Sequence, residues 1–220
     1  QLRVAWTYPH GDTGSVPIAV RGVLYGRGRN GSLVALDAKT GAEIWVRENM
    51  TGMTGRGLNY WESADGRDQR LIFSMNSLLQ EVDAKTGRVF WQYRYPVSPE
   101  ARVCCGSNNR GLAILGSTLF MGTLDGHLVA IDAAGGRPLW NVAVGDPRLG
   151  YSITMAPLAV KDKVLVGVGG GEYGIRGFVA AYDAKTGTEA WKFYTIPDPG
   201  EPGHDTWEGD DWKTGGAPAW

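Results

Sequence analysis

The chain has 220 residues, of which 43% are hydrophobic and 20% charged, a profile typical of a folded protein and not of a disordered one. The formal net charge is −1, and no basic stripe is present to neutralise phosphates, so we expect no nucleic-acid partner. No apolar stretch is long enough for a membrane span, and none is expected. The first residues lack a basic leader and an apolar core, so we expect a processed or truncated chain.

The composition indicates a β protein with many turns. The chain contains 33 glycines and 9 tryptophans. Apolar residues alternate or form short β-branched runs, and no convincing amphipathic helix is present. We therefore predict an all-β fold.

In chain order, the first clear elements are strands over 16–20, 23–27 and 33–37, with turns at Arg21-Gly22 and Asn30-Gly31. The same order returns later, with strands over 112–115, 118–123 and 128–132 around Gly116-Ser117 and Asp125-Gly126. Asn-Gly and Asp-Gly between apolar runs are strong hairpin signals.

One signature follows these strands four times: an apolar strand, an Asp, a Gly four residues later and a Trp four residues after that. The Asp residues are Asp37, Asp83, Asp132 and Asp183, separated by 46, 49 and 51 residues. The Asp can accept hydrogen bonds from turn amides, and the Gly supplies a positive φ. The Trp then lies on the returning strand, where its ring can cover an adjacent repeat.

Four short strands per repeat of this length are typical of a β-propeller blade. We predict one partial propeller domain over residues 1–220, with repeat signatures near 33–45, 79–91, 128–140 and 179–191. A stack of independent sandwiches is the alternative, but one sandwich would not repeat its own turn.

Two adjacent cysteines, Cys104 and Cys105, depart from the repeat. Consecutive Cα atoms lie about 3.8 Å apart, which is shorter than the usual disulfide range of roughly 4.4–6.8 Å. A bond between these residues would close a strained, rigid ring. Two small buried thiols are the alternative.

A glycine-rich run, Gly169 to Gly174, is the second departure. It matches GxGxxG formally, but a strand and not a helix follows, which excludes the dinucleotide interpretation. Bare glycines let a flat ligand approach the backbone. Glu172 is an oxygen donor suited to calcium, and a β-bulge with a solvated Glu172 is the alternative.

The acidic loop over 196–211 offers no clear metal site. Its acidic residues are expected to form a solvated face; they are Asp205, Glu208, Asp210 and Asp211. The three histidines are scattered without zinc spacing.

Taken together, these departures resemble the quinoprotein methanol/ethanol dehydrogenase family, which uses pyrroloquinoline quinone (PQQ). The Asp-Ala-Lys-Thr-Gly…Trp repeats look like that family's tryptophan-docking motifs, which tie together an eight-bladed propeller. The runs over 104–113, 150–157 and 169–177 are more specific. The resemblance covers about residues 75–220 closely, so this chain would hold about four of the eight blades.

The resemblance implies a role for nine residues. Cys104 and Cys105 would form a vicinal disulfide against one face of PQQ, and Trp220 would stack on the other face. Arg110 would bind a PQQ carboxylate and Thr154 would hydrogen-bond to PQQ. Gly169, Gly170 and Gly171 would line the ring edge. Glu172 would bind the metal, calcium or a lanthanide, that polarises the quinone carbonyl.

The implied reaction is oxidation of a small primary alcohol to an aldehyde, with electrons passed to a cytochrome c in the periplasm. No catalytic residue is assigned within this chain, because the family's aspartate base lies beyond its last residue, and we expect no turnover from this chain alone. Two alternatives are kept. One is a propeller without cofactor that serves as a binding or assembly scaffold, and the other is a quinoprotein sugar dehydrogenase, which residues 1–74 resemble more.

Overall fold

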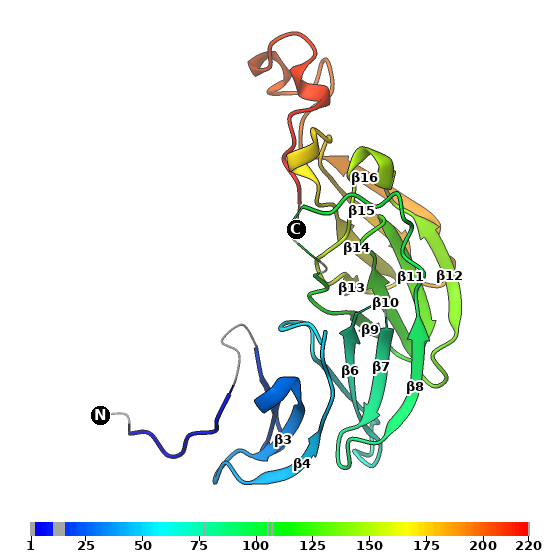
Figure 1. Cartoon of the computed structure of the whole chain (residues 1–220). Coiled ribbons are helices and arrows are strands. Elements are labelled where there is room, and N and C mark those ends of the chain that lie inside the picture. Colours follow the sequence, from blue (N-terminus) through cyan, green and yellow to red (C-terminus); the bar gives the residue numbers. More distant parts are fainter. Residues whose placement is uncertain (1–2, 11–15, 77, 105, 107, 220) are drawn as a thin grey trace. The chain divides into compact units, whose positions relative to one another are not determined.

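The computed structural model describes residues 3–10, 16–76, 78–104, 106 and 108–219. The chain forms two compact units, Gln1–Tyr95 and Pro96–Trp220. Each unit contains two four-stranded antiparallel sheets (Figure 1). The described residues contain no α-helix, only short 3-10 turns. The all-β prediction is therefore confirmed.

In unit 1 the strands follow one another in each sheet in chain order. The first sheet contains β1 (Ile18–Val20), β2 (Val23–Arg27), β3 (Leu33–Asp37) and β4 (Glu43–Arg47), with the 3-10 turn η1 (Arg29–Gly31) between β2 and β3. The second sheet contains β5 (Asn59–Glu62), β6 (Gln69–Met75), β7 (Leu78–Asp83) and β8 (Val89–Arg94).

Unit 2 repeats this arrangement. Its first sheet contains β9 (Ala113–Leu115), β10 (Thr118–Gly122), β11 (His127–Asp132) and β12 (Pro138–Ala143). Its second sheet contains β13 (Leu158–Val160), β14 (Lys163–Gly167), β15 (Phe178–Asp183) and β16 (Glu189–Tyr194). The 3-10 turns of this unit are η2 (Pro147–Leu149), η3 (Gly171–Tyr173), η4 (His204–Thr206) and η5 (Asp211–Lys213).

The repeated Asp forms the turn that the sequence predicts. The Asp37 carboxylate accepts hydrogen bonds from the backbone N–H groups of Lys39 and Thr40, at 3.0 and 2.8 Å. Asp183 repeats the pattern with the backbone N–H groups of residues 185 and 186, at 3.0 and 2.9 Å. These bonds satisfy amides that the turn removes from the strand ladder.

Two tryptophans of the repeat, Trp45 and Trp140, dock on the turn of the next sheet. The indole N–H of Trp45 donates to the Ala84 carbonyl at 2.9 Å, and that of Trp140 donates to the Ala184 carbonyl at 3.2 Å. Trp6, which lies outside the signature, donates to the Ala38 carbonyl in the same way at 3.1 Å. Each bond joins two segments within one unit.

A glycine at the end of the turn makes room for the docked ring. Gly87 has a φ of +72°, and a Cβ added there would lie 3.0 Å from a ring atom of Trp45. Gly187 stands in the same relation to Trp140, with a φ of +73° and an approach of 2.9 Å. The fixed spacing of Asp, Gly and Trp is therefore the spacing that one docking contact requires.

We expect Gly87→Ala to lower the free energy of unfolding by about 1 kcal/mol more than Gly22→Ala. Both glycines lie in unit 1 at similar positive φ, +72° and +78°, but an added Cβ at Gly22 meets nothing within 4 Å. The control therefore carries only the backbone cost, whereas Gly87→Ala also displaces Trp45. Urea midpoints measure the difference, and equal midpoints would contradict the docking role of Gly87.

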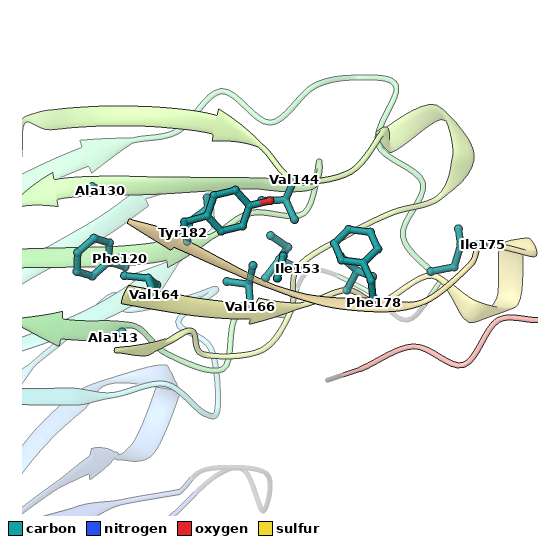
Figure 2. Packing of buried hydrophobic residues seen from close by; sticks show 13 residues of the cluster. Ala113, Phe120, Ala130, Val144, Ile153, Val164, Val166, Ile175, Phe178 and Tyr182 are labelled. Atoms are coloured by element: carbon teal, nitrogen blue, oxygen red, sulfur yellow. The ribbon is translucent and has the colours of Figure 1, made fainter. Parts of the chain in front are cut away.

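The core of unit 2 lies between its two sheets. Phe120 of β10 and Val164, Val166 and Tyr182 of β14 and β15 are almost completely buried there. Figure 2 shows their side chains between the strands, with Ile175 and Phe178 at one end of the cluster. This end adjoins η3, so the core supports the loop that carries Glu172.

Unit 1 has a polar departure from the repeat. Glu81 occupies the position at which the other three signatures have Ala, and it is fully buried. The Arg70 guanidinium donates to its carboxylate and lies over the rings of Trp61 and Phe90, at 5.6 and 4.7 Å from their centroids. Burial raises the pKa of Glu81 to about 7, although Arg70 acts in the opposite direction. The ion pair of Arg70 and Glu81 thus lies in the interior of unit 1 and does not line the cavity of unit 2.

Candidate cofactor and metal site

Three loops of unit 2 surround one cavity of about 100 Å³. The first loop precedes β9, the second joins β12 to β13, and the third joins β14 to β15. The cavity is lined by Val103, Cys104, Gly106, Asn108, Arg110, Ser152, Thr154, Gly169, Gly170, Glu172 and Tyr173. Six of the nine residues predicted from the sequence therefore meet at one place: Cys104, Arg110, Thr154, Gly169, Gly170 and Glu172.

Backbone hydrogen bonds hold the three loops together. Ser152 and Gly169 exchange two bonds, of 3.3 and 2.8 Å, as an isolated antiparallel bridge. The Arg110 backbone N–H donates to the Thr154 carbonyl at 3.1 Å, and the Arg110 guanidinium reaches the same oxygen at 3.4 Å. Arg110 and Gly169, 59 positions apart in the sequence, thus belong to one continuous wall.

The glycines of this wall are needed for space. Gly170 has a φ of +115°, and a Cβ there would lie 2.1 Å from the Gly150 carbonyl oxygen. Gly169 is buried beside Ser152, whose hydroxyl oxygen would be 3.1 Å from an added Cβ. At Gly170 only bare backbone fits, and at Gly169 a side chain would press on Ser152. Bare backbone at both positions lets a ring edge approach.

Gly171 differs from the other two glycines of the run. It begins η3 and is not among the residues that line the cavity. An added Cβ there would lie 2.8 Å from Pro218. Two further predicted residues, Cys105 and Trp220, lie outside the described residues, so their assignments stay predictions. Cys104 itself is exposed and disulfide-bonded.

Glu172 is exposed and lies on the rim of the cavity within the single turn of η3. A hard cation favours such a carboxylate oxygen. Within the described part of the chain, no group of three or more His, Cys, Asp or Glu residues is arranged to hold a metal ion.

Sequence reasoning did not assign Ser152 to the site. It is only 5% exposed and lines the cavity through its bridge to Gly169. Asn108 and Tyr173 line it as well. These residues lie within the three specific runs, but only the pairing of the loops indicates which of them face the cavity.

The acidic loop behaves as expected from its composition. Asp205, Glu208, Asp210 and Asp211 are all exposed. The glycine-rich run leads into β15 and not into a helix, as the sequence predicts. No helix among the described residues has the length and apolar character that a membrane crossing requires.

This chain is similar to known proteins. The PQQ_2 family model, described as "Outer membrane protein assembly factor BamB", matches residues 3–193. The chain belongs to the PQQ_2 family. BamB from Moraxella catarrhalis has a similar fold. Its structure matches 78% of this chain and 58% of its own, with 23% identity and a TM-score of 0.50.

Closer sequence relatives of this PQQ_2 chain are alcohol dehydrogenases. Quinohemoprotein alcohol dehydrogenase ADH IIB of Pseudomonas putida is 49% identical over 147 residues, which are 61% of this chain and 21% of the relative. The lanthanide-dependent methanol dehydrogenase of Methylacidiphilum fumariolicum (strain SolV) is 42% identical over 64% of this chain and 26% of the relative. The chain thus spans about a quarter or less of these relatives, and the resemblance seen in the sequence is confirmed.

A solved structure supports the propeller prediction. A europium-containing methanol dehydrogenase has a TM-score of 0.66 and 36% identity, over 76% of this chain and 33% of that one. The four-stranded sheets of this chain are therefore propeller blades, and the fold-class prediction is confirmed.

Proposed function

We propose that this chain forms one wall of a PQQ and metal site in a periplasmic quinoprotein that oxidises a small primary alcohol to an aldehyde and passes the electrons to a cytochrome c. The main support is the meeting of Cys104, Arg110, Thr154 and Glu172 at one cavity of unit 2. The similarity to quinohemoprotein and lanthanide-dependent alcohol dehydrogenases points to the same chemistry.

The lining residues fit the cofactor and the metal. PQQ is a flat tricarboxylate, and the planar fork of Arg110 suits bidentate contact with a carboxylate. The bare backbone of Gly169 and Gly170 leaves room for a ring edge, because side chains there would collide with neighbouring segments. Glu172 supplies a carboxylate oxygen for calcium or a lanthanide.

The size of the cavity indicates that the described residues form only part of a cofactor site. Ligand pockets usually enclose roughly 300–1,000 Å³, whereas this cavity measures about 100 Å³. We infer that the chain contributes a partial site, completed by residues beyond those described.

When bound, PQQ with its metal supplies a two-electron acceptor and a Lewis acid. The residues of this chain have binding roles: Arg110 holds a carboxylate, Glu172 holds the cation at the rim, and the disulfide of Cys104 offers an apolar face. None of them is assigned as the base that accepts the alcohol proton.

A PQQ titration of the full-length protein tests this function. With calcium chloride or europium chloride present, we expect saturable quenching of tryptophan fluorescence, and about tenfold weaker binding in Arg110→Lys, because a point charge replaces a planar fork. Arg137→Lys, at an exposed position of the same unit, is the control. Absence of saturable quenching with either metal would contradict the proposal.

Two alternatives predict different results. A scaffold propeller, which the description of the family model favours, would bind no PQQ. A quinoprotein sugar dehydrogenase would bind PQQ but oxidise glucose faster than ethanol, so comparing the two substrates separates it from an alcohol dehydrogenase.

A further inference from the structure

Arg176 is a largely buried cation that does not line the cavity. Its side chain is 12% exposed, and it follows Glu172 by four residues. The guanidinium donates twice to the Ile196 carbonyl, at 3.0 and 2.6 Å, and pairs with Asp198 at 2.9 Å. A planar group with fixed donors is suited to such convergent contacts.

Two aromatic rings complete the environment of Arg176. The guanidinium carbon lies 3.9 Å from the ring centroid of Tyr194 and 4.8 Å from that of Trp212. Tyr194 ends β16, whereas Trp212 lies in η5, at the far end of the long loop. One side chain therefore holds both ends of the segment over 195–215.

The segment that follows this loop runs beside the glycine-rich run. Gly216 forms a parallel bridge with Arg176, donating to the Ile175 carbonyl at 2.8 Å and accepting from Gly177 at 2.7 Å. Three residues later, Ala219 donates to the Val168 carbonyl at 3.0 Å. The backbone over 216–219 thus lies along both ends of the loop that carries Gly169, Gly170 and Glu172.

A second connection runs from Arg176 to the cavity. The Tyr151 hydroxyl donates to the Arg176 carbonyl at 3.0 Å, and Tyr151 directly precedes the cavity residue Ser152. Burial raises the pKa of Tyr151, so this hydroxyl keeps its proton and donates. Arg176 therefore contacts the long loop through its side chain, and Gly216 and Tyr151 through its backbone.

We propose that Arg176 is a positioning residue: it clamps the loop over 195–215 and thereby holds the segment over 216–219 against the cavity wall, which sets the affinity for PQQ. This inference rests on the proposed function. Arg176 lines no part of the cavity itself; its side chain acts through the loop over 195–215, which leads into the segment that bridges its backbone at Gly216.

Arg176→Lys in the full-length protein tests the clamp, because it keeps the positive charge and removes the planar fork. We expect trypsin to cleave after Lys213, whose side chain is 54% exposed, about tenfold faster than in the wild type. We also expect the PQQ dissociation constant in the presence of calcium to rise about tenfold, with kcat at saturating PQQ within about twofold of the wild type.

Arg148→Lys is the matched control. Arg148 also makes an ion pair, in its case a bidentate one with Asp146, but its side chain is 67% exposed and the pair lies within one turn. Neither trypsin cleavage nor PQQ affinity should change in this variant. If Arg176→Lys fails to fold, Trp212→Leu removes one stacking partner and should shift both measurements in the same direction.

Unchanged cleavage after Lys213 in Arg176→Lys would overturn the clamp. A lower melting temperature with an unchanged PQQ dissociation constant would also overturn it, because Arg176 would then be structural only. If the wild type binds no PQQ, the proposed function fails, whereas faster cleavage in Arg176→Lys would still support the clamp on the loop.

Discussion

Glu172→Gln is expected to weaken metal-dependent PQQ binding and to lower alcohol oxidation by about a hundredfold. A carboxylate oxygen binds a hard cation through its negative charge, and the amide oxygen of Gln lacks that charge. Glu172 lies on an exposed turn at the rim, so the substitution leaves the buried core of unit 2 intact. Calcium or europium titration in the presence of PQQ measures the effect.

Glu208→Gln is the control for this prediction. Glu208 is an exposed carboxylate of the same unit, in the acidic loop, and does not line the cavity. The two substitutions remove the same charge from the unit. Equal metal affinities for the two variants would show that Glu172 is a solvated carboxylate, the alternative that its sequence context left open.

Gly170→Ala is expected to lower the free energy of unfolding by about 3 kcal/mol, from a strained backbone and overpacking together. At a φ of +115° an L side chain is strained, and the added Cβ would lie 2.1 Å from the Gly150 carbonyl oxygen. Relief requires the loop of Gly150 to move away from the glycine-rich run. The shared bridge between Ser152 and Gly169 would then open, and PQQ quenching should be lost.

Gly116→Ala separates the two causes. Gly116 lies in the turn between β9 and β10 with a φ of +59°, and an added Cβ there meets nothing within 4 Å. Its cost should be limited to the backbone, about 1–2 kcal/mol, with PQQ binding unchanged. Urea midpoints and fluorescence titrations of the two variants give the comparison, and equal values in both would exclude a special role for Gly170.

The blades could be predicted because their signals are local. Alternation of apolar residues sets the strand faces, and Asp, Gly and Trp at spacings of four belong to a single hairpin. The strand 23–27 and the strand 33–37 were predicted with the bounds that β2 and β3 have. The turn carboxylates of Asp37 and Asp183 bond the amides that turn chemistry assigns to them.

Only some residues of the candidate site could be predicted from the sequence. Arg110, Thr154 and Glu172 could be identified because each lies in a run that resembles a known family. Ser152 could not, because its place at the cavity depends on a bridge to Gly169, 17 positions away in the sequence. Gly171 was grouped with its two neighbours, but its own backbone direction turns it toward Pro218.

The sequence by itself thus determined the all-β class and the repeated blade, since these follow from periodicity and turn chemistry, and its resemblance to a known family pointed to part of the cavity lining. Only the tertiary structure decided that Trp6 docks like the tryptophans of the repeat and that Arg176 joins both ends of a long loop. Such contacts form between segments that are distant in the chain, and no local spacing encodes which carbonyl or ring a buried donor will meet.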